Sequence, residues 1–387
     1  MKQLLYIAFN NCENQLFGVH AKILSQCQAL SEYGYEVDLI ERQNTNTILL
    51  RNGAIIETIK QRTTLLNHRY IRSVLDKQYQ IRDIKQYLRG KHYDACYIRY
   101  DFSDHGFLSL LKELKKVCPC IALEMPTYPY DAENQAMLLS RAKLAIDKIY
   151  RKQLHKYIDF IVTFYDGYQT IFDIPVQVVP NGFDFSRMDL VTQEFPNDDI
   201  HIIAVSSMRE WHGYERFLEG MHAYYQADKT SHRSIVLHLV GKGREYGKYQ
   251  NLVEQYGLQD HVIMEGAMHG EKLDALYEHC ALGIDSLARH RSGIDVLSSL
   301  KSREYGAKGL PMINSCKIDI IDDNFPYLFQ VPADESAIDM NEVVNFYDRC
   351  FHNRKTRLEI GKEVRTYIEE RSSMKKTFEP IVQRFKK

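Results

Sequence analysis

The chain has 387 residues, which is too long for one ordinary hydrophobic core and predicts two domains of roughly 150–200 residues each. Hydrophobic residues make up 44% of the chain and charged residues 26%, a composition that excludes a disordered chain. Lys and Arg number 50 against 51 Asp and Glu, and this balance argues against a nucleic-acid partner.

The sequence contains no membrane-spanning or export signal that we can identify. No stretch approaches the roughly 18 apolar residues of a spanning helix, and the N-terminal apolar run is too short for a signal peptide. The eight cysteines include no CxxC pair, and the close pair Cys118 and Cys120 lacks two further ligands for a metal. We therefore expect a cytoplasmic protein with reduced cysteines and no metal site.

The first half of the chain alternates between strand and helix patterns. Leu4–Phe9 reads as a strand, Gly18 to Tyr33 as an amphipathic helix and Glu36–Ile40 as a second strand, which together form a βαβ unit. Further strands are expected at Ala95–Ile98, Ile121–Glu124, Phe160–Thr163 and Gln177–Val179. The pattern predicts a doubly wound parallel sheet in an N-terminal domain of residues 1–184.

A second α/β domain is expected at residues 200–365. The polar segment Asp184 to Asp199 reads as a linker. Strands and helices then alternate, with strands at Ile200–Ser206, Ile235–Val240, Val262–Glu265, Leu282–Ser286 and Met312–Asn314 and helices at Glu215–Tyr225, Lys248–Tyr256, Lys272–Cys280 and Ser299–Ala307. Residues 366–387 read as a C-terminal helix that could pack back on the first domain. The architecture we predict is two doubly wound domains facing a cleft.

The stretch from Lys60 to Lys91 is strongly basic. It holds nine Lys and Arg residues, opposed only by Asp76 and Asp83, and apolar residues interleave at near-helical spacing. Such a pattern fits a peripheral helix on an anionic membrane, and it fits equally a solvated helix face packed on the sheet.

The most informative local pattern lies in the second domain, where Lys301 and Glu304 share one face of the helix predicted at Ser299–Ala307. Lys301 falls in the first turn, where backbone N–H groups and the helix dipole favour an anion such as a phosphate. A carboxylate one turn later can accept two hydrogen bonds from a ribose diol. Alternatively, Glu304 could form a surface ion pair with Lys308.

Five segments in order make the whole chain resemble a GT-B glycosyltransferase of family 4, the glycosyl transferases group 1. They are Gly18-Val19 with residues 29–37, Val179 to Asp184, Val240 to Arg244, Val262 to Gly266 and Glu304 to Pro311. Local phrases at residues 124–130, 211–214 and 290–291 resemble a branch of polysaccharide biosynthesis.

The resemblance implies two Rossmann-like domains and transfer of a hexosyl group from a nucleotide-diphosphate sugar with retention of configuration. It implies no bound metal and no cofactor beyond the UDP- or GDP-linked donor. The acceptor would be a glycan, such as a polyprenyl-diphosphate-linked oligosaccharide at the inner face of a bacterial membrane.

The resemblance also assigns residues on the donor side. Glu304 would bind the donor ribose as the second glutamate of a paired motif whose first position is Val296 here. The family's arginine and lysine after the first strand of this domain fall at Ser207 and His212, so we expect Lys301 and Arg291 to meet the diphosphate charge. The remaining expected donor contacts are Arg209, His212, Gly266, His290 and Gly293. Isolated arginines in this loop are equally consistent with ordinary solvated charge.

In the first domain Gly18 permits close backbone approach to the donor phosphates or the acceptor. The expected acceptor contacts follow the strand ends and are Arg99, Glu124, Thr127 and Tyr128. Glu124 could instead pair with Arg99. Two other functions stay open, a non-catalytic partner that binds glycans or nucleotide sugars and an NAD-dependent oxidoreductase or epimerase. The latter lacks a GxGxxG fingerprint.

Overall fold

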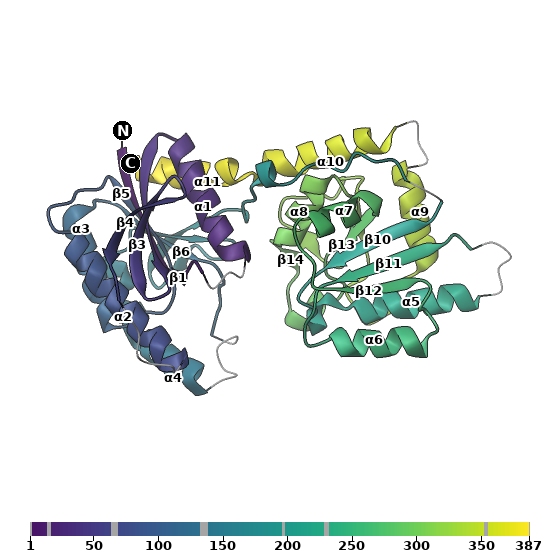
Figure 1. The fold of residues 1–387 in the computed structure, drawn as a ribbon, viewed down its shortest axis with the longest axis horizontal. Helices are drawn as coiled ribbons and strands as arrows, with labels where there is room; N and C mark the ends of the chain where they lie inside the picture. The colour runs from purple at the N-terminus through teal and green to yellow at the C-terminus, as the bar shows by residue number, and fades with distance from the viewer. Residues whose placement is uncertain are drawn as a thin grey trace. The chain divides into compact units, whose positions relative to one another are not determined.

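The computed structural model describes residues 2–13, 17–62, 69–131, 138–195, 198–227, 232–351 and 355–386. The chain forms two compact units, the first made of Met1–Gly182 and Met374–Lys387 and the second of Phe183–Ser373 (Figure 1). None of the helices within these ranges combines the length and hydrophobicity needed to cross a bilayer.

The first unit is built on a nine-stranded sheet in the order β4-β3-β2-β1-β5-β6-β7-β9-β8. The strands β1, β2, β5, β6, β7 and β9 are parallel. In chain order the strands are β1 (Lys2–Asn11), β2 (Tyr35–Gln43), β3 (Asn46–Arg51), β4 (Ala54–Lys60), β5 (Ala95–Arg99), β6 (Ile121–Met125), β7 (Phe160–Thr163), β8 (Thr170–Ile171) and β9 (Ile174–Val178). The antiparallel strands β3 and β4 extend one edge and were not expected from the sequence.

Both faces of this sheet are covered by helices, because successive side chains of a strand point to opposite faces. Leu5 and Ile7 of β1 share a core with α2 (Arg69–Tyr87) and α3 (His105–Val117). Leu4 and Tyr6 share the opposite core with α1 (Phe17–Glu32) and with α11 (Met374–Phe385), which returns from the end of the chain (Figure 1). The remaining helix of the unit is α4 (Leu138–Tyr150), which the 3-10 turn η1 (Arg151–Lys156) follows.

The second unit contains a fully parallel six-stranded sheet in the order β12-β11-β10-β13-β15-β17. Its strands are β10 (Ile200–Val205), β11 (Ile235–Val240), β12 (Val262–Gly266), β13 (Leu282–Ile284), β15 (Met312–Asn314) and β17 (Leu328–Gln330). A separate short pair joins β14 (Val296–Leu297) to β16 (Lys317–Ile318). The helices are α5 (Tyr214–Gln226), α6 (Tyr246–Gln255), α7 (Glu271–His279), α8 (Leu300–Lys308), α9 (Met340–Phe351) and α10 (Arg357–Ser372). The predicted pair of doubly wound parallel-sheet domains is therefore confirmed.

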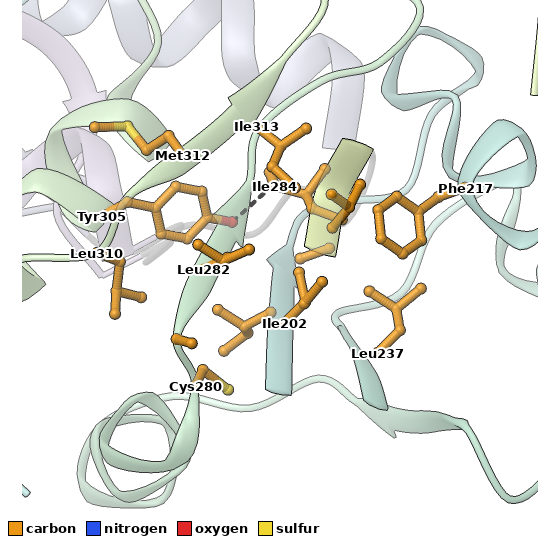
Figure 2. Close-up of a cluster of buried hydrophobic side chains, with 14 of the residues drawn as sticks. Ile202, Phe217, Leu237, Cys280, Leu282, Ile284, Tyr305, Leu310, Met312 and Ile313 are labelled. Atoms are coloured by element: carbon orange, nitrogen blue, oxygen red, sulfur yellow. Dashed lines mark hydrogen bonds between the residues drawn. The ribbon is translucent and has the colours of Figure 1, made fainter. Parts of the chain in front are cut away.

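The core of the second unit positions α8, the helix that carries the most informative sequence pattern (Figure 2). The Tyr305 hydroxyl donates to the Ile284 carbonyl at 2.9 Å and accepts from the Val205 N–H at 3.1 Å, so one buried side chain links α8 to the ends of β13 and β10. A Cβ on Gly283 would lie 2.6 Å from the Tyr305 ring, which shows how closely α8 approaches β13. The start of α8 is therefore held beside the carboxyl end of β13.

The segment that the sequence suggested as a linker is packed against the second unit. Phe185 and Val191 are buried in its core, and the Arg365 guanidinium donates to the carbonyls of Phe185 and Met188 at 2.8 and 2.7 Å. The few apolar side chains of this polar segment are the ones that pack, which a reading of average composition does not detect. At the other end, residues 366–372 extend α10 in the second unit, and the first unit takes up the chain from Met374.

Candidate functional site

In the second unit the candidate residues gather where parallel strands end. The 3-10 turn η3 (Glu210–His212) comes after β10, and η4 (Arg289–Ser292) comes after β13. Backbone hydrogen bonds join the two turns, from Leu287 N to His212 O at 2.8 Å and from Ala288 N to Trp211 O at 3.3 Å. A Cβ on Gly213 would lie 2.5 Å from the Ala288 Cβ, so only glycine allows this approach. The two loops form one surface at the carboxyl edge of the sheet.

Lys301 lies at this edge, but Asp285 compensates its charge. The Lys301 Nζ is 2.9 Å from the Asp285 Oδ1 and 2.5 Å from the Asp285 carbonyl oxygen. Ser299, the N-cap of α8, donates its hydroxyl to the other Asp285 carboxylate oxygen. Burial alone would raise the pKa of Asp285, but Lys301 and Ser299 hold that pKa below its ordinary value. Lys301 is therefore a fixed cation in an ion pair with a buried carboxylate, and no local sequence pattern indicates Asp285 as its partner.

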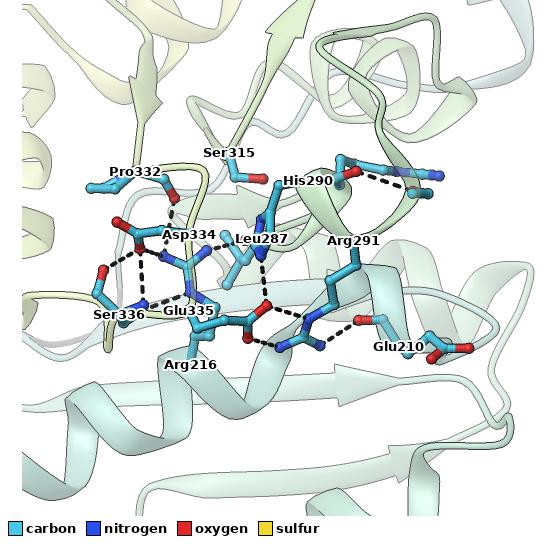
Figure 3. Close-up of polar contacts among 12 residues, drawn as sticks. Glu210, Arg216, Leu287, His290, Arg291, Ser315, Pro332, Asp334, Glu335 and Ser336 are labelled. Carbon is cyan, nitrogen blue, oxygen red and sulfur yellow. Dashed lines mark hydrogen bonds and ion pairs between the residues drawn. The ribbon is translucent and has the colours of Figure 1, made fainter.

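Arg291 and His290 are also bound to carboxylates (Figure 3). The Arg291 Nε donates to Glu335 at 2.9 Å and its Nη1 to Glu215 at 2.6 Å, while the His290 Nε2 lies 2.7 Å from Glu335. These pairs hold the pKa of Arg291 above its ordinary value. Arg291 therefore links α5 to the segment that follows β17, and two carboxylates balance its charge.

Arg289 differs from its two neighbours in η4. Its guanidinium carbon lies 5.6 Å from the centroid of the Trp211 ring, and its Nε is buried without an acceptor. Within the part of the chain that the structure describes, no carboxylate comes within 4.0 Å of it. We did not include Arg289 among the site residues from the sequence, because its proximity to Trp211 and His212 depends on how the two loops pack.

His212 stands where the family supplies a lysine, and the structure makes it a neutral hydrogen-bond donor. Only 5% of the residue is exposed, and its Nδ1 accepts the Arg209 backbone N–H at 2.8 Å. Burial, with Lys301 and Arg289 nearby, lowers the pKa of His212 to about 2. The ring therefore carries its proton on Nε2, which presents a neutral N–H beside two cations. Arg209 and Ser207 in the same loop are exposed.

Glu304 lies one turn further along α8 than Lys301. It accepts the Tyr277 hydroxyl at 2.8 Å, and burial raises its pKa above the ordinary value. No Lys, Arg or His nitrogen among the described residues lies within 4.0 Å of this carboxylate, because Lys308 pairs with Asp274 at 2.6 Å. The surface ion pair that the sequence offered as an alternative is therefore not formed, and the carboxylate keeps acceptor capacity for hydroxyl groups.

Two glycines expected at the donor complete this edge. Gly266 ends β12 with φ of 70° and its carbonyl accepts the Gly241 N–H at 2.6 Å. Gly293 closes η4 with φ of 64°, and a Cβ there would meet open space. Val296, at the position of the missing first glutamate, has a 51% exposed side chain in β14. The described residues include no group of three His, Cys, Asp or Glu side chains placed to hold a metal ion.

In the first unit the structure brings Arg99 and Glu124 together at the ends of β5 and β6. Glu124 is fully buried and accepts hydrogen bonds from Tyr97 at 2.7 Å, Gln26 at 2.6 Å and Arg99. Burial alone would raise the pKa of Glu124, but Arg99 holds it below its ordinary value. An ionised, fully hydrogen-bonded carboxylate is poorly suited to act as a base, and the pairing with Arg99 that the sequence left open is the one observed.

The other candidates of the first unit are Thr127, Tyr128 and Gly18. Thr127 and Tyr128 follow β6 and are partly buried, and the Tyr128 ring meets the ring of Tyr168 edge to face at 4.9 Å. Gly18 falls in the first turn of α1.

Comparison with known proteins supports a glycosyltransferase. Residues 189–288 match the family model described as glycosyl transferases group 1. No curated protein sequence matches the chain.

Solved structures match over the full length. Sucrose-phosphate synthase from Thermosynechococcus elongatus is 14% identical, with a TM-score of 0.64 over 100% of this chain and 98% of that one. HepE from Anabaena in complex with UDP is 12% identical, with a TM-score of 0.61 over 100% of both chains. A glycosyltransferase from Rickettsia africae is 13% identical, with a TM-score of 0.61 over 100% of this chain and 98% of that one. These structures show that the whole chain has the GT-B fold, and the match to glycosyl transferases group 1 lies within its second unit.

Proposed function

We propose that the protein transfers a hexosyl group from a nucleotide-diphosphate sugar to a hydroxyl of a glycan acceptor, with retention of configuration. In this reaction the bond between the anomeric carbon and the diphosphate oxygen breaks, and a bond to the acceptor oxygen forms. The acceptor proton passes to the departing diphosphate. The donor is UDP- or GDP-linked, and we place UDP-sugars first because the HepE structure holds UDP.

The Glu304 carboxylate is the observation that carries the proposal. It lies in the helix where the resemblance places the ribose ligand, it has no cation within 4.0 Å among the described residues, and the Tyr277 hydroxyl orients it. A carboxylate in this state accepts hydrogen bonds from two neighbouring hydroxyls.

Residues of η3 and η4 stabilise the negative charge of the leaving diphosphate. Arg289 supplies a cation that has no described carboxylate within 4.0 Å, and His212 supplies an N–H on its Nε2. Lys301 is paired with Asp285 and holds the start of α8 beside this surface. Hydrogen-bond donors and charges that are already in place stabilise a developing negative charge without reorganisation.

On the acceptor side we propose a lipid-linked glycan and a role in surface polysaccharide biosynthesis at the inner face of the membrane. Thr127 and Tyr128 are partly buried candidates that follow β6, whereas Glu124 is paired with Arg99. These assignments follow from the resemblance and from the placement of the residues after β6.

The test is release of nucleotide from UDP-, GDP-, dTDP- and ADP-sugars by the purified full-length protein. The variant Glu304→Gln should lose most release from the preferred donor. The matched control Glu254→Gln changes an exposed glutamate of α6 and should keep it. Equal release by the wild type and Glu304→Gln would remove Glu304 from the site.

The alternative is a non-catalytic protein that binds nucleotide sugars. It is favoured by the compensated charges of Lys301 and Arg291. Calorimetric binding of one donor without release, with acceptor glycans present, would establish that alternative. No binding of any donor would refute both functions.

A further inference from the structure

The helix α4 presents an exposed apolar face that no described part of its unit covers. Leu144 and Asp147 point inward, whereas Ala142, Ala145, Ile146 and Ile149 are exposed. Their spacing of three and four residues places them on one side of the helix. Ile146 is 47% exposed, and Ile149, at 65%, is the most exposed large apolar side chain in the described part of the chain. Two isoleucines on one exposed helix face predict a binding surface.

Basic residues predominate along α4 and η1. Residues 138–156 contain six Lys and Arg and a single acidic residue, Asp147. Asp147 is buried and accepts hydrogen bonds from the Tyr130 hydroxyl and the Ser103 N–H, both at 2.6 Å. Asp131 pairs with Arg151 at 2.7 Å and Lys148 at 3.2 Å, and Lys152 and Lys156 extend the exposed basic edge into η1. The surface of α4 and η1 is therefore apolar at its centre and cationic along its edge.

The basic stretch at residues 60–91, which the sequence left open as a membrane surface or a solvated helix face, differs from α4 in the burial of its apolar residues. Residues 63–68 lie outside the described part of the chain. In α2, Ile81, Ile84 and the following Leu88 pack in the core. The Lys77 side chain is buried beside Asp101 and Asp104. The described part of this stretch offers exposed cations such as Arg82, but its helical isoleucines point inward.

We propose that α4 and η1 form a docking surface for an anionic lipid bilayer. Ile146 and Ile149 enter the region between headgroups and acyl chains, and Lys152 and Lys156 bind lipid phosphates. An amphipathic helix with a basic polar edge binds the interface by this combination of apolar burial and electrostatic attraction. Exposed cations of one sign around the isoleucines favour a lipid surface over a protein partner, because the cores of protein interfaces are depleted in lysine. This inference goes beyond glycosyl transfer and does not depend on it.

The test is cosedimentation of the full-length protein with vesicles of phosphatidylglycerol and phosphatidylcholine in equal parts, compared with vesicles of phosphatidylcholine alone. The wild type should bind the anionic vesicles more strongly, and salt should weaken binding. Ile146→Ser with Ile149→Ser should lower binding about tenfold. Lys152→Glu with Lys156→Glu should lower it by more than about tenfold, since each basic residue near an anionic surface contributes about fivefold.

The matched control is Ile55→Ser with Ile56→Ser, which removes two isoleucines of similar exposure, 48% and 51%, from β4 of the same unit. This variant should bind like the wild type. Equal loss in the control, unchanged binding by the α4 variants, or equal binding to both kinds of vesicle would overturn the proposal. A dimer that only the α4 variants dissociate, without vesicle binding, would assign the face to self-association instead.

A failure here can be told apart from a failure of the proposed reaction. The α4 variants should release nucleotide from a water-soluble donor like the wild type, and Glu304→Gln should still bind vesicles. Circular dichroism should show the wild-type thermal transition for the exposed substitutions in α4, η1 and β4.

Discussion

The charges at the edge of the second sheet predict that Arg289 contributes to catalysis far more than to stability. Replacing Arg289 with alanine removes a half-buried guanidinium that stacks on Trp211 and has no carboxylate partner in the described part of the chain. The removal breaks no ion pair, so we expect the thermal transition to stay within a few degrees of the wild type.

The expected effect on catalysis is much larger than the effect on stability. Removal of one preorganised donor to a developing negative charge typically lowers kcat by about 10²–10³, which corresponds to about 3–4 kcal/mol. We expect a loss of this size for Arg289→Ala, because Lys301 and Arg291 are already paired with Asp285, Glu215 and Glu335. Arg289→Lys keeps the charge without the planar fork and should show an intermediate loss.

The assay is steady-state nucleotide release with the preferred donor, together with differential scanning fluorimetry. Arg291→Ala is the matched control, because it removes an arginine from the same 3-10 turn but breaks its ion pairs, which leaves Glu215 with Lys248 and Glu335 with His290. We expect it to lower stability by about 1–3 kcal/mol. If Arg289→Ala turns over the donor like the wild type, or if it melts as early as Arg291→Ala, the assignment of Arg289 as the uncompensated cation is refuted.

Three further predictions concern buried titratable groups. Burial raises the pKa of Glu304, so acidification should raise the donor KM at a higher pH than for an exposed glutamate, and Glu304→Gln should abolish this dependence in a KM-against-pH profile. Burial lowers the pKa of His212 to about 2 in the folded state, whereas the unfolded chain has the ordinary pKa of 6.5. Below pH 6.5 the unfolded chain therefore binds a proton that the folded state does not. His212 should therefore lower stability by about 2.3 kcal/mol between pH 6.5 and 4.5, measured as the difference in urea midpoints between wild type and His212→Gln. Equal acid sensitivity of the two proteins would contradict this. Glu124→Gln should destabilise the first unit by about 3–5 kcal/mol, because it leaves the Arg99 charge buried without its counter-ion, and an unchanged melting temperature would argue against the buried network.

The spacing of apolar residues predicts most of the fold, because buried parallel strands and amphipathic helices have regular apolar patterns in the sequence. The strands β10, β11 and β12 lie where such patterns occur. The hairpin of β3 and β4 escaped that reading, since its exposed outer strand has no apolar alternation of its own. Its turn did leave a signal, the dipeptide Asn52-Gly53, whose φ angles are 52° and 77°. Asn-Gly is the preferred pair for a two-residue hairpin turn with positive φ at both positions.

The site shows a different limit of sequence reading. The positions of Lys301 and Glu304 on one helix follow from spacing alone. The partners that decide their charge state, Asp285 and Tyr277, come from β13 and α7, and no local pattern joins them to α8. The sequence could therefore suggest which residue types gather at the strand ends. It could not show which of the cations a carboxylate compensates.

This distinction changes how the loss of two family cations is understood. Ser207 and His212 leave the loop after β10 without the permanent charges that the resemblance leads one to expect, and the sequence suggested Arg291 and Lys301 as replacements. The structure instead places Arg291 and Lys301 in ion pairs that fix η4 and the start of α8. A compensated cation contributes direction and rigidity, whereas an uncompensated one contributes net charge. We propose on this argument that the net positive charge offered to a diphosphate comes from Arg289 and the exposed Arg209, with the neutral Nε2 of His212 beside them, and that the paired residues hold this surface in place.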